Sequence, residues 1–242
     1  ALAGWIVATT GEALCFLLNA GSYLAVLLAL LAVRLPTGGP RKASSPPLQA
    51  LREGLSYATA HRRIRASLLL IASLSLLATP YTVLMPLFAR EILGGDARLF
   101  GLLMGSAGAG ALLAAVVLAR RTDTAGLAVL VGRAVPLVGL ALALFALAGT
   151  LWQAVPILVG LGFCILLCVA GSNTLIQTAV DNDFRGRVMA LFTMAFLGLA
   201  PIGSFAVGSL AHAFGVRPTL IACGLLTALA GLVYRRNPGG RH

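Results

Sequence analysis

The side chains that could do acid–base or metal chemistry lie outside the apolar stretches of this chain. Its seven carboxylates and three histidines all fall between or beyond the long apolar runs, so no general acid–base pair, Ser/His/Asp set or metal-ligand cluster lies inside them. Arg133 is the one full charge within a run, and a guanidinium does not give up its proton at ordinary pH. We therefore expect no enzymatic activity, no cofactor and no metal site.

The polar groups that remain inside the runs are uncharged hydroxyls and amides, which bind by hydrogen bonds. Tyr81 and Thr82 lie in one run, and Ser172, Asn173 and Gln177 lie in another. An unpaired amide in hydrocarbon is costly, so these groups must face other helices or water. Helix–helix packing explains the two amides as well as contact with a substrate does, and the sequence leaves both interpretations open.

Seven apolar runs must hold these groups in place. Each is close to the roughly 20 residues that a helix rising ~1.5 Å per residue needs to cross ~30 Å of hydrocarbon. The composition agrees, with 59% hydrophobic residues and a mean hydropathy of +0.97. The sequence predicts an all-α polytopic membrane bundle with spans at Ala13–Val33, Ala66–Phe88, Leu99–Ala119, Thr124–Gly149, Val155–Val180, Val188–Ala211 and Pro218–Tyr234.

The basic residues set the predicted topology. A net charge of +11 would suggest nucleic acid as the partner of a soluble protein. When the runs are threaded back and forth, however, fourteen arginine and lysine residues fall on one face and only Arg90, Arg98 and Arg217 on the other. This positive-inside asymmetry predicts that the first face is cytoplasmic. The expected partner is therefore membrane lipid, and no nucleic acid is expected.

A proline-rich segment divides the chain. Leu35–Pro47 holds four prolines and precedes leucines at positions 48, 51 and 55, whose spacing predicts a short amphipathic helix at the cytoplasmic lipid surface. The predicted domains are residues 1–34, the end of a first bundle; 35–64, a cytoplasmic linker; and 65–242, a second bundle. Ala1–Thr10 resembles half a span, so we expect the chain to be the C-terminal portion of a longer protein, with about seven full spans and part of another.

The segment from Gly171 to Gly215 carries the most local detail. Asp183 is placed to cap the helix that follows it, and Pro201 is expected to bend the span. Gly198, Gly203 and Gly208 are expected to allow close backbone approach by a neighbouring helix.

Several motifs in order along the chain resemble the major facilitator superfamily, in particular its bacterial branch of drug and siderophore exporters, the enterobactin-exporter-like or transmembrane secretion effector group. The matching pieces are Asn173–Gln177, Arg185–Met189, Gly198–Gly203, Gly11–Ala20, Leu51–Leu55 and Phe88–Gly95. The resemblance covers nearly the whole chain, as the end of the fifth span through the twelfth. The superfamily's Gly-x-x-x-Asp-Arg signature is absent after the eighth span, where the chain reads Ala115–Arg120.

The resemblance implies a twelve-helix transporter whose seventh and tenth spans line a central cavity. The candidate cavity residues are then Tyr81, Thr82, Met85, Ser172, Asn173, Gln177 and Met194. The candidate cytoplasmic gate or cap residues are Arg120, Asp123, Asp183, Arg185 and Arg187.

By the same resemblance, the expected function is proton-driven efflux of a small amphipathic molecule, a drug or siderophore, by alternating access in a bacterial cell membrane. The expected partners are that small-molecule substrate and the missing N-terminal half of the same transporter. The alternative is a non-transporting scaffold or sensor, or an inactive fragment, on the same fold.

Overall fold

The structure is a computed structural model that describes residues 12–33, 46–121, 124 and 126–236. It divides into two units, residues 1–46 and 47–242, which are treated separately. All regular structure in the described residues is helical. The first unit contributes α2 (Glu12–Ala32), which covers nearly all of the predicted run Ala13–Val33. The predicted half-span Ala1–Thr10 lies outside the described residues.

The second unit contains six helical spans that are long and apolar enough to cross a membrane. This confirms the six predicted spans that follow the linker. A short helix, α3 (Pro47–Ala60), precedes them. The spans are α4–η1–α5 (Arg62–Ser73, Leu74–Ala78, Tyr81–Glu91), α6 (Ala97–Ala119), α7 (Leu127–Leu147), α8 (Leu151–Ala179), α9–η2–α10 (Arg185–Thr193, Met194–Gly198, Ala200–Phe214) and α11 (Val216–Arg236).

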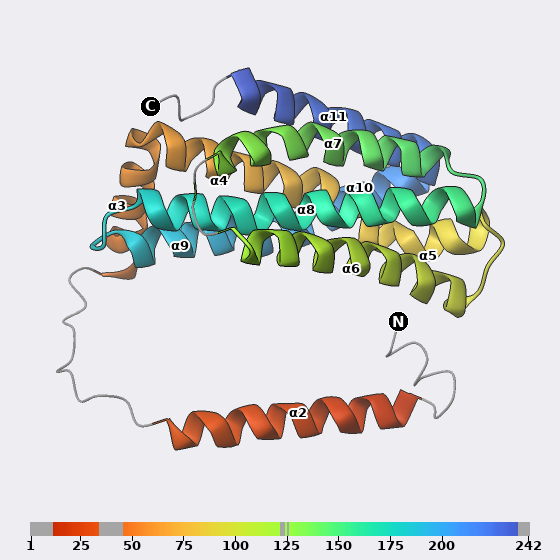
Figure 1. Ribbon diagram of the computed structural model, residues 1–242, viewed down its shortest axis with the longest axis horizontal. Coiled ribbons are helices and arrows are strands. Elements are labelled where there is room, and N and C mark those ends of the chain that lie inside the picture. Colours follow the sequence, from red (N-terminus) through yellow and green to blue (C-terminus); the bar gives the residue numbers. More distant parts are fainter. Residues whose placement is uncertain (1–11, 34–45, 122–123, 125, 237–242) are drawn as a thin grey trace. The chain divides into compact units, whose positions relative to one another are not determined.

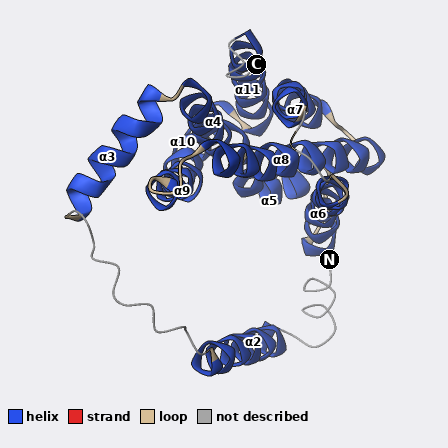
Figure 2. Ribbon diagram, turned by 60° about the vertical axis from the view of Figure 1, so that its left-hand side comes forward, coloured by secondary structure: helices blue, strands red, loops and turns tan. Residues whose placement is uncertain are grey.

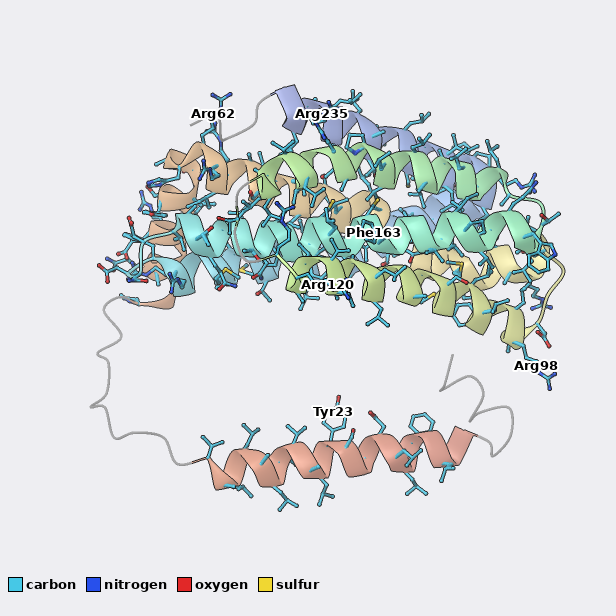
Figure 3. The ribbon with its side chains drawn as sticks, in the orientation of Figure 1. Tyr23, Arg62, Arg98, Arg120, Phe163 and Arg235 are labelled. Atoms are coloured by element: carbon cyan, nitrogen blue, oxygen red, sulfur yellow. The ribbon has the colours of Figure 1, made fainter. Side chains whose placement is uncertain are left out.

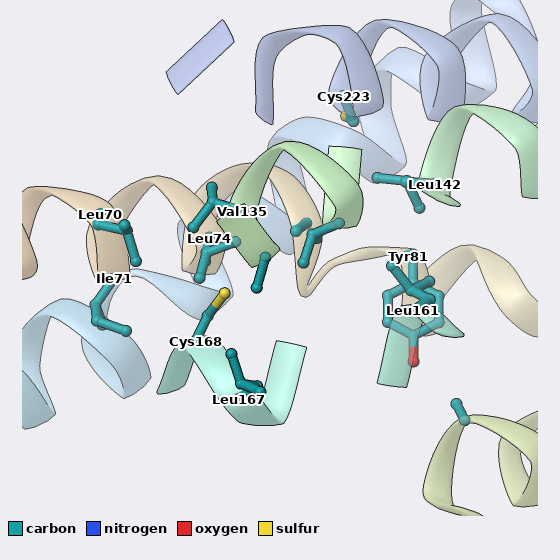
Figure 4. Packing of buried hydrophobic residues seen from close by; sticks show 14 of the residues in the cluster. Leu70, Ile71, Leu74, Tyr81, Val135, Leu142, Leu161, Leu167, Cys168 and Cys223 are labelled. Carbon is teal, nitrogen blue, oxygen red and sulfur yellow. The ribbon is translucent and has the colours of Figure 1, made fainter. Parts of the chain in front are cut away.

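Four of these spans form a tightly packed block. Helix α7 runs along both α8 and α11, and α6 runs along the other side of α8 (Figure 1, Figure 2). The side chains buried between the spans are almost all aliphatic or aromatic, and Leu74, Val135 and Leu167 are among those drawn in Figure 4. The two interrupted spans, α4–η1–α5 and α9–η2–α10, pack against each other through η1 and α10.

Glycines bring the backbones of α6 and α8 into direct contact. A Cβ atom added to Gly162 would fall on the carbonyl oxygen of Ala107, and one added to Gly110 would fall on that of Val159. We call this contact the α6–α8 seam. Helices α7 and α11 meet in the same way at Gly139 and Gly224. Small residues at such crossings allow close packing where no hydrophobic effect drives helices together.

The predicted close approach of a neighbouring helix to the span α9–η2–α10 is confirmed at one glycine of three. An added Cβ on Gly203 would lie 2.7 Å from the carbonyl oxygen of Leu76. An added Cβ on Gly198 or Gly208 would meet no described atom within 4 Å, so for these two the close approach stays a prediction. Positions 198 and 208 are each five residues from position 203, so they do not share the side of the helix that packs here.

Apart from Arg133 within α7, the charged residues of the bundle gather at its two ends. Figure 3 shows Arg62 and Arg98 at opposite ends. The end that we call the basic end carries Arg62, Arg63, Arg65, Arg120, Arg121, Arg185, Arg187 and Arg235, whereas the other carries Arg90, Arg98 and Arg217. At that second end the carboxylate of Asp96 caps α6 by accepting from the backbone N–H groups of residues 98 and 99, at 3.0 and 3.2 Å.

Cysteine labelling tests the predicted orientation. Arg98 and Ser56 are both exposed, the first at the start of α6 and the second on α3. With Arg98→Cys, a membrane-impermeant maleimide is expected to label intact cells; with Ser56→Cys, only permeabilised cells should be labelled. The unsubstituted chain controls for its own cysteines. Labelling of position 56 in intact cells would reverse the assignment of the basic end to the cytoplasm.

Candidate functional site

Two interrupted spans meet inside the bundle, and their irregular segments face each other. In η1 the backbone N–H of Thr79 donates to the carbonyl of Leu74, five residues back, at 2.9 Å. Pro80 follows and has no N–H, so it supplies no α-helical donor to the carbonyl of Leu76. The buried hydroxyl of Ser75 donates to the carbonyl of Phe196 in η2 at 2.6 Å. Short π-helical segments occur often at functional sites and at bends.

Gly203 completes this contact, which we call the π-bulge junction. Its backbone lies against the carbonyl oxygens of Ser75 and Leu76, so the two spans touch without side chains between them. Pro201 lies in the first turn of α10, just after η2, where a proline is tolerated. The bend expected near Pro201 is therefore present as a π-helical turn at Met194–Gly198 and a bend at Leu199.

The cavity candidates in α5 are mostly enclosed by the bundle, whereas the candidate in η2 is more exposed. Tyr81 and Met85 are buried, and Figure 4 shows Tyr81 among the hydrophobic side chains of the core. Thr82 is half-buried, and its hydroxyl donates to the carbonyl of Thr79 at 3.0 Å. Met194, in η2, is 54% exposed. Of these four side chains, Met194 has the largest exposed fraction.

The cavity candidates Ser172, Asn173 and Gln177 lie in α8, toward its basic end. The side-chain amide of Gln177 donates to the side-chain oxygen of Asn173 one turn earlier. Arg185 donates to the backbone carbonyl of Gln177 at 3.4 Å, which brings a gate candidate next to the amide pair. Gln177 is exposed and Asn173 half-buried, whereas Ser172 is buried and its hydroxyl has no hydrogen-bond partner among the described residues. Two amides and a guanidinium thus form one hydrogen-bonding surface.

The remaining gate candidates are Arg120, Asp123, Asp183 and Arg187. Arg120 is exposed at the end of α6, and Asp123 lies outside the described residues. The predicted cap at Asp183 is wrong: α9 begins at Arg185 with Phe184 as its N-cap, and no side chain caps it. A turn closed by the Phe184 N–H and the Asp181 carbonyl at 3.0 Å moves the start of the helix one residue beyond the predicted position.

Arg187, in α9, makes contacts that link this helix to α3. Its guanidinium forms an ion pair with Glu53 at 3.0 Å, with both side chains partly exposed, and it lies 5.4 Å from the ring of Phe184. Gly54 allows this approach, because an added Cβ there would lie 3.0 Å from the Cβ of Arg187. Arg187 therefore holds the linker helix against the bundle.

Tyr57 of α3 makes the most extensive of these contacts. Its hydroxyl donates to the carboxylate of Asp181 at 2.9 Å and accepts from the Asp181 backbone N–H at 3.2 Å. Its ring stacks on those of Phe184 and His61, with centroids 4.2 and 4.1 Å apart. We call the contacts of Glu53 and Tyr57 with the segment from Asp181 to Arg187 the linker clasp.

Sequence reasoning missed the linker clasp. It identified the apolar stripe of Leu48, Leu51 and Leu55, and these three side chains are exposed. The docked face is instead formed by Gly54, Tyr57 and Ala58, of which the first and last are buried. Positions 54, 57 and 58 have the i, i+3, i+4 spacing of one helix face, and that spacing was a usable signal. In the described residues no group of three or more His, Cys, Asp or Glu side chains could hold a metal ion.

Comparison with known proteins gives a consistent result. A family model described as transmembrane secretion effector matches residues 1–238. The staphyloferrin A transporter of Staphylococcus aureus (strain NCTC 8325 / PS 47) is 28% identical over 245 aligned positions, which cover 97% of this chain. The MFS-type transporter YfiS of Bacillus subtilis (strain 168), named as uncharacterized, is 29% identical over 264 positions, which cover 96% of the chain. The chain spans 58% of the length of each relative.

Proposed function

This chain belongs to the transmembrane secretion effector family of the major facilitator superfamily, and we propose that it forms the C-terminal bundle, and the span before it, of an exporter for small amphipathic molecules. It is a multi-pass membrane protein with an all-helical fold. We place it in the cell membrane of a bacterium, oriented with the basic end in the cytoplasm. Residues 65–242 then rock against a six-span bundle supplied by the N-terminal half, and residues 35–64 link the two.

The π-bulge junction is the observation that carries this proposal. Alternating access is largely a rigid-body rocking of one bundle against the other, and bends within a span let that span adjust while the bundle around it stays folded. The junction places two interrupted spans in backbone contact, whereas α6, α7, α8 and α11 are continuous.

The polar surface at the basic end of α8 suits a cargo with hydrogen-bonding groups. Asn173, Gln177 and Arg185 offer amide and guanidinium donors, and Met194 is an exposed and flexible apolar side chain. A drug or a siderophore has this mixed character, and one relative is named as a staphyloferrin A transporter. None of the chain's carboxylates lies inside its apolar runs. We therefore assign proton coupling to a carboxylate outside these spans.

Export assays on amide variants test the proposal. The reading frame that encodes these residues is expressed in an efflux-deficient bacterium, and export of a fluorescent dye and of a siderophore is measured. Asn173→Leu and Gln177→Leu are expected to change the half-saturation concentration of one cargo relative to the other by about tenfold, equivalent to one hydrogen bond. Thr174→Leu, on an exposed position of the same helix, is the matched control and should leave the ratio unchanged.

The outcomes separate the alternatives. A protonophore should abolish export, and the amide variants should keep the pH dependence of the parent. An equal loss for both cargoes would mean that the Asn173–Gln177 pair only packs α8 against its neighbours. A change in pH dependence would contradict the assignment of coupling to another site, and no export by the parent would favour a non-transporting scaffold.

A further inference from the structure

A groove opens between α4 and α11 at the basic end of the bundle. Its volume is about 810 Å³, within the ~300–1,000 Å³ range of small-molecule sites. We call it the α4–α11 groove. It is lined by Arg62, Arg65, Ala66, Leu69, Leu70, Ser73, Leu77, Leu226, Leu229, Ala230, Val233 and Tyr234.

The groove is cationic at its mouth and apolar along its length. Arg62 and Arg65 lie in the first turn of α4, and no carboxylate is among the lining residues. Arg65 donates to the carbonyl of Thr59 at 3.3 Å, so one arm of its guanidinium is anchored to the end of α3. A guanidinium has five donors, and this contact uses one of them.

The walls fit a hydrocarbon chain. Leu69 is 65% exposed, Leu229 57% and Val233 54%, and all three lie on membrane-spanning helices. From Arg62 to Leu77 the wall follows fifteen residues of helix, about 22 Å at 1.5 Å per residue. One leaflet of hydrocarbon is about 15 Å deep, half of the ~30 Å core. The α4 wall of the groove is therefore long enough to reach from the headgroup layer to the bilayer midplane.

We propose that the α4–α11 groove binds one anionic phospholipid of the cytoplasmic leaflet, with its phosphate at Arg62 and Arg65 and an acyl chain along Leu69, Leu229 and Val233. Each basic residue near an anionic headgroup contributes about 1 kcal/mol, so two of them correspond to roughly a 30-fold preference over a zwitterionic lipid. A bound lipid would also touch α4 and α11 together, and would thus bridge an interrupted span and a continuous one.

Native mass spectrometry of the full chain tests this site. The protein is released from mixed vesicles of phosphatidylglycerol and phosphatidylcholine, and the lipids retained per chain are counted. The parent should keep one phosphatidylglycerol with about a 30-fold preference. Arg62→Gln with Arg65→Gln should remove the preference, whereas Arg120→Gln with Arg121→Gln, at the same end but outside the groove, should keep it. Ala230→Phe, which narrows the groove without changing its charge, should lower retention of either lipid.

Four results would overturn the proposal. Equal retention of both lipids by the parent would show that charge does not select the occupant. Equal effects of the two arginine pairs, or full retention by the Ala230→Phe variant, would show adsorption to the basic end and not a groove. Displacement by inorganic phosphate or by glycerophosphoglycerol at millimolar concentration would show that the site takes a free phosphate group without acyl chains.

Discussion

Gly162→Leu is expected to prevent the six-span bundle from reaching its folded state. The new side chain would begin on the carbonyl oxygen of Ala107, and backbone atoms cannot move aside as a flexible side chain can. Overpacking a core costs about 1–3 kcal/mol even where side chains adjust, and a backbone clash costs more. We therefore expect loss of the monodisperse peak in detergent gel filtration and a lower melting temperature for any protein recovered.

Gly160→Leu is the matched control for this prediction. It makes the same substitution two residues earlier on α8, where an added Cβ meets no described atom within 4 Å. This variant should behave as the parent does. Gly110→Leu, on the other side of the α6–α8 seam, should reproduce the defect, and Gly108→Leu should not. Similar behaviour of the variants at 160 and 162 would mean that the two helices are not in backbone contact.

Tyr57→Ala is expected to release α3 from the bundle. The substitution removes two hydrogen bonds to Asp181 and two ring stacks, on Phe184 and His61. At about 1 kcal/mol for each hydrogen bond and 0.5 kcal/mol or more for each stack, the loss is about 3 kcal/mol. Amide hydrogen exchange across residues 47–60 should therefore accelerate by about 100-fold, as measured by mass spectrometry.

Tyr57→Phe separates the two contributions. The phenylalanine ring keeps the stacking and loses only the hydroxyl with its two hydrogen bonds, so exchange in α3 should rise about 30-fold, between the parent and the alanine variant. The spans themselves should exchange as in the parent. Unchanged exchange in the alanine variant would assign the docking of α3 to the ion pair between Glu53 and Arg187, which is partly exposed and expected to contribute at most about 1 kcal/mol.

The spans could be predicted from the sequence because lipid imposes a simple rule on it. An apolar stretch of sufficient length needs no information about its neighbours, so each helix of the bundle covers most of its predicted run. The boundaries differ where the local chemistry is polar: α4 begins at Arg62, four residues before the predicted run, because arginines at a helix end can extend to the headgroups. The bend near Pro201 was predictable because proline removes a specific hydrogen bond.

The candidate site was only partly predictable, because its contacts join distant parts of the chain. Asn173 and Gln177 are four residues apart on one helix, and their pairing follows from helical spacing. Tyr57 and Asp181 are 124 residues apart, and Ser75 and Phe196 are 121 apart. Periodicity within one helix says nothing about such pairs. Tyr81 and Met85 are buried among the side chains of their own bundle, a placement that the sequence of their span did not indicate.

The α6–α8 seam also has a mechanical consequence. Where the backbones of two helices are in contact, no side chain lies between them that could change rotamer as the helices shift. We therefore expect α6 and α8 to move together. Helices α7 and α11 are joined in the same way at Gly139 and Gly224, and α7 also packs along α8. Bending is then expected mainly at the π-helical turns Leu74–Ala78 and Met194–Gly198. A force on this bundle is therefore expected to bend the two interrupted spans at these turns, while α6, α7, α8 and α11 move together as one rigid group.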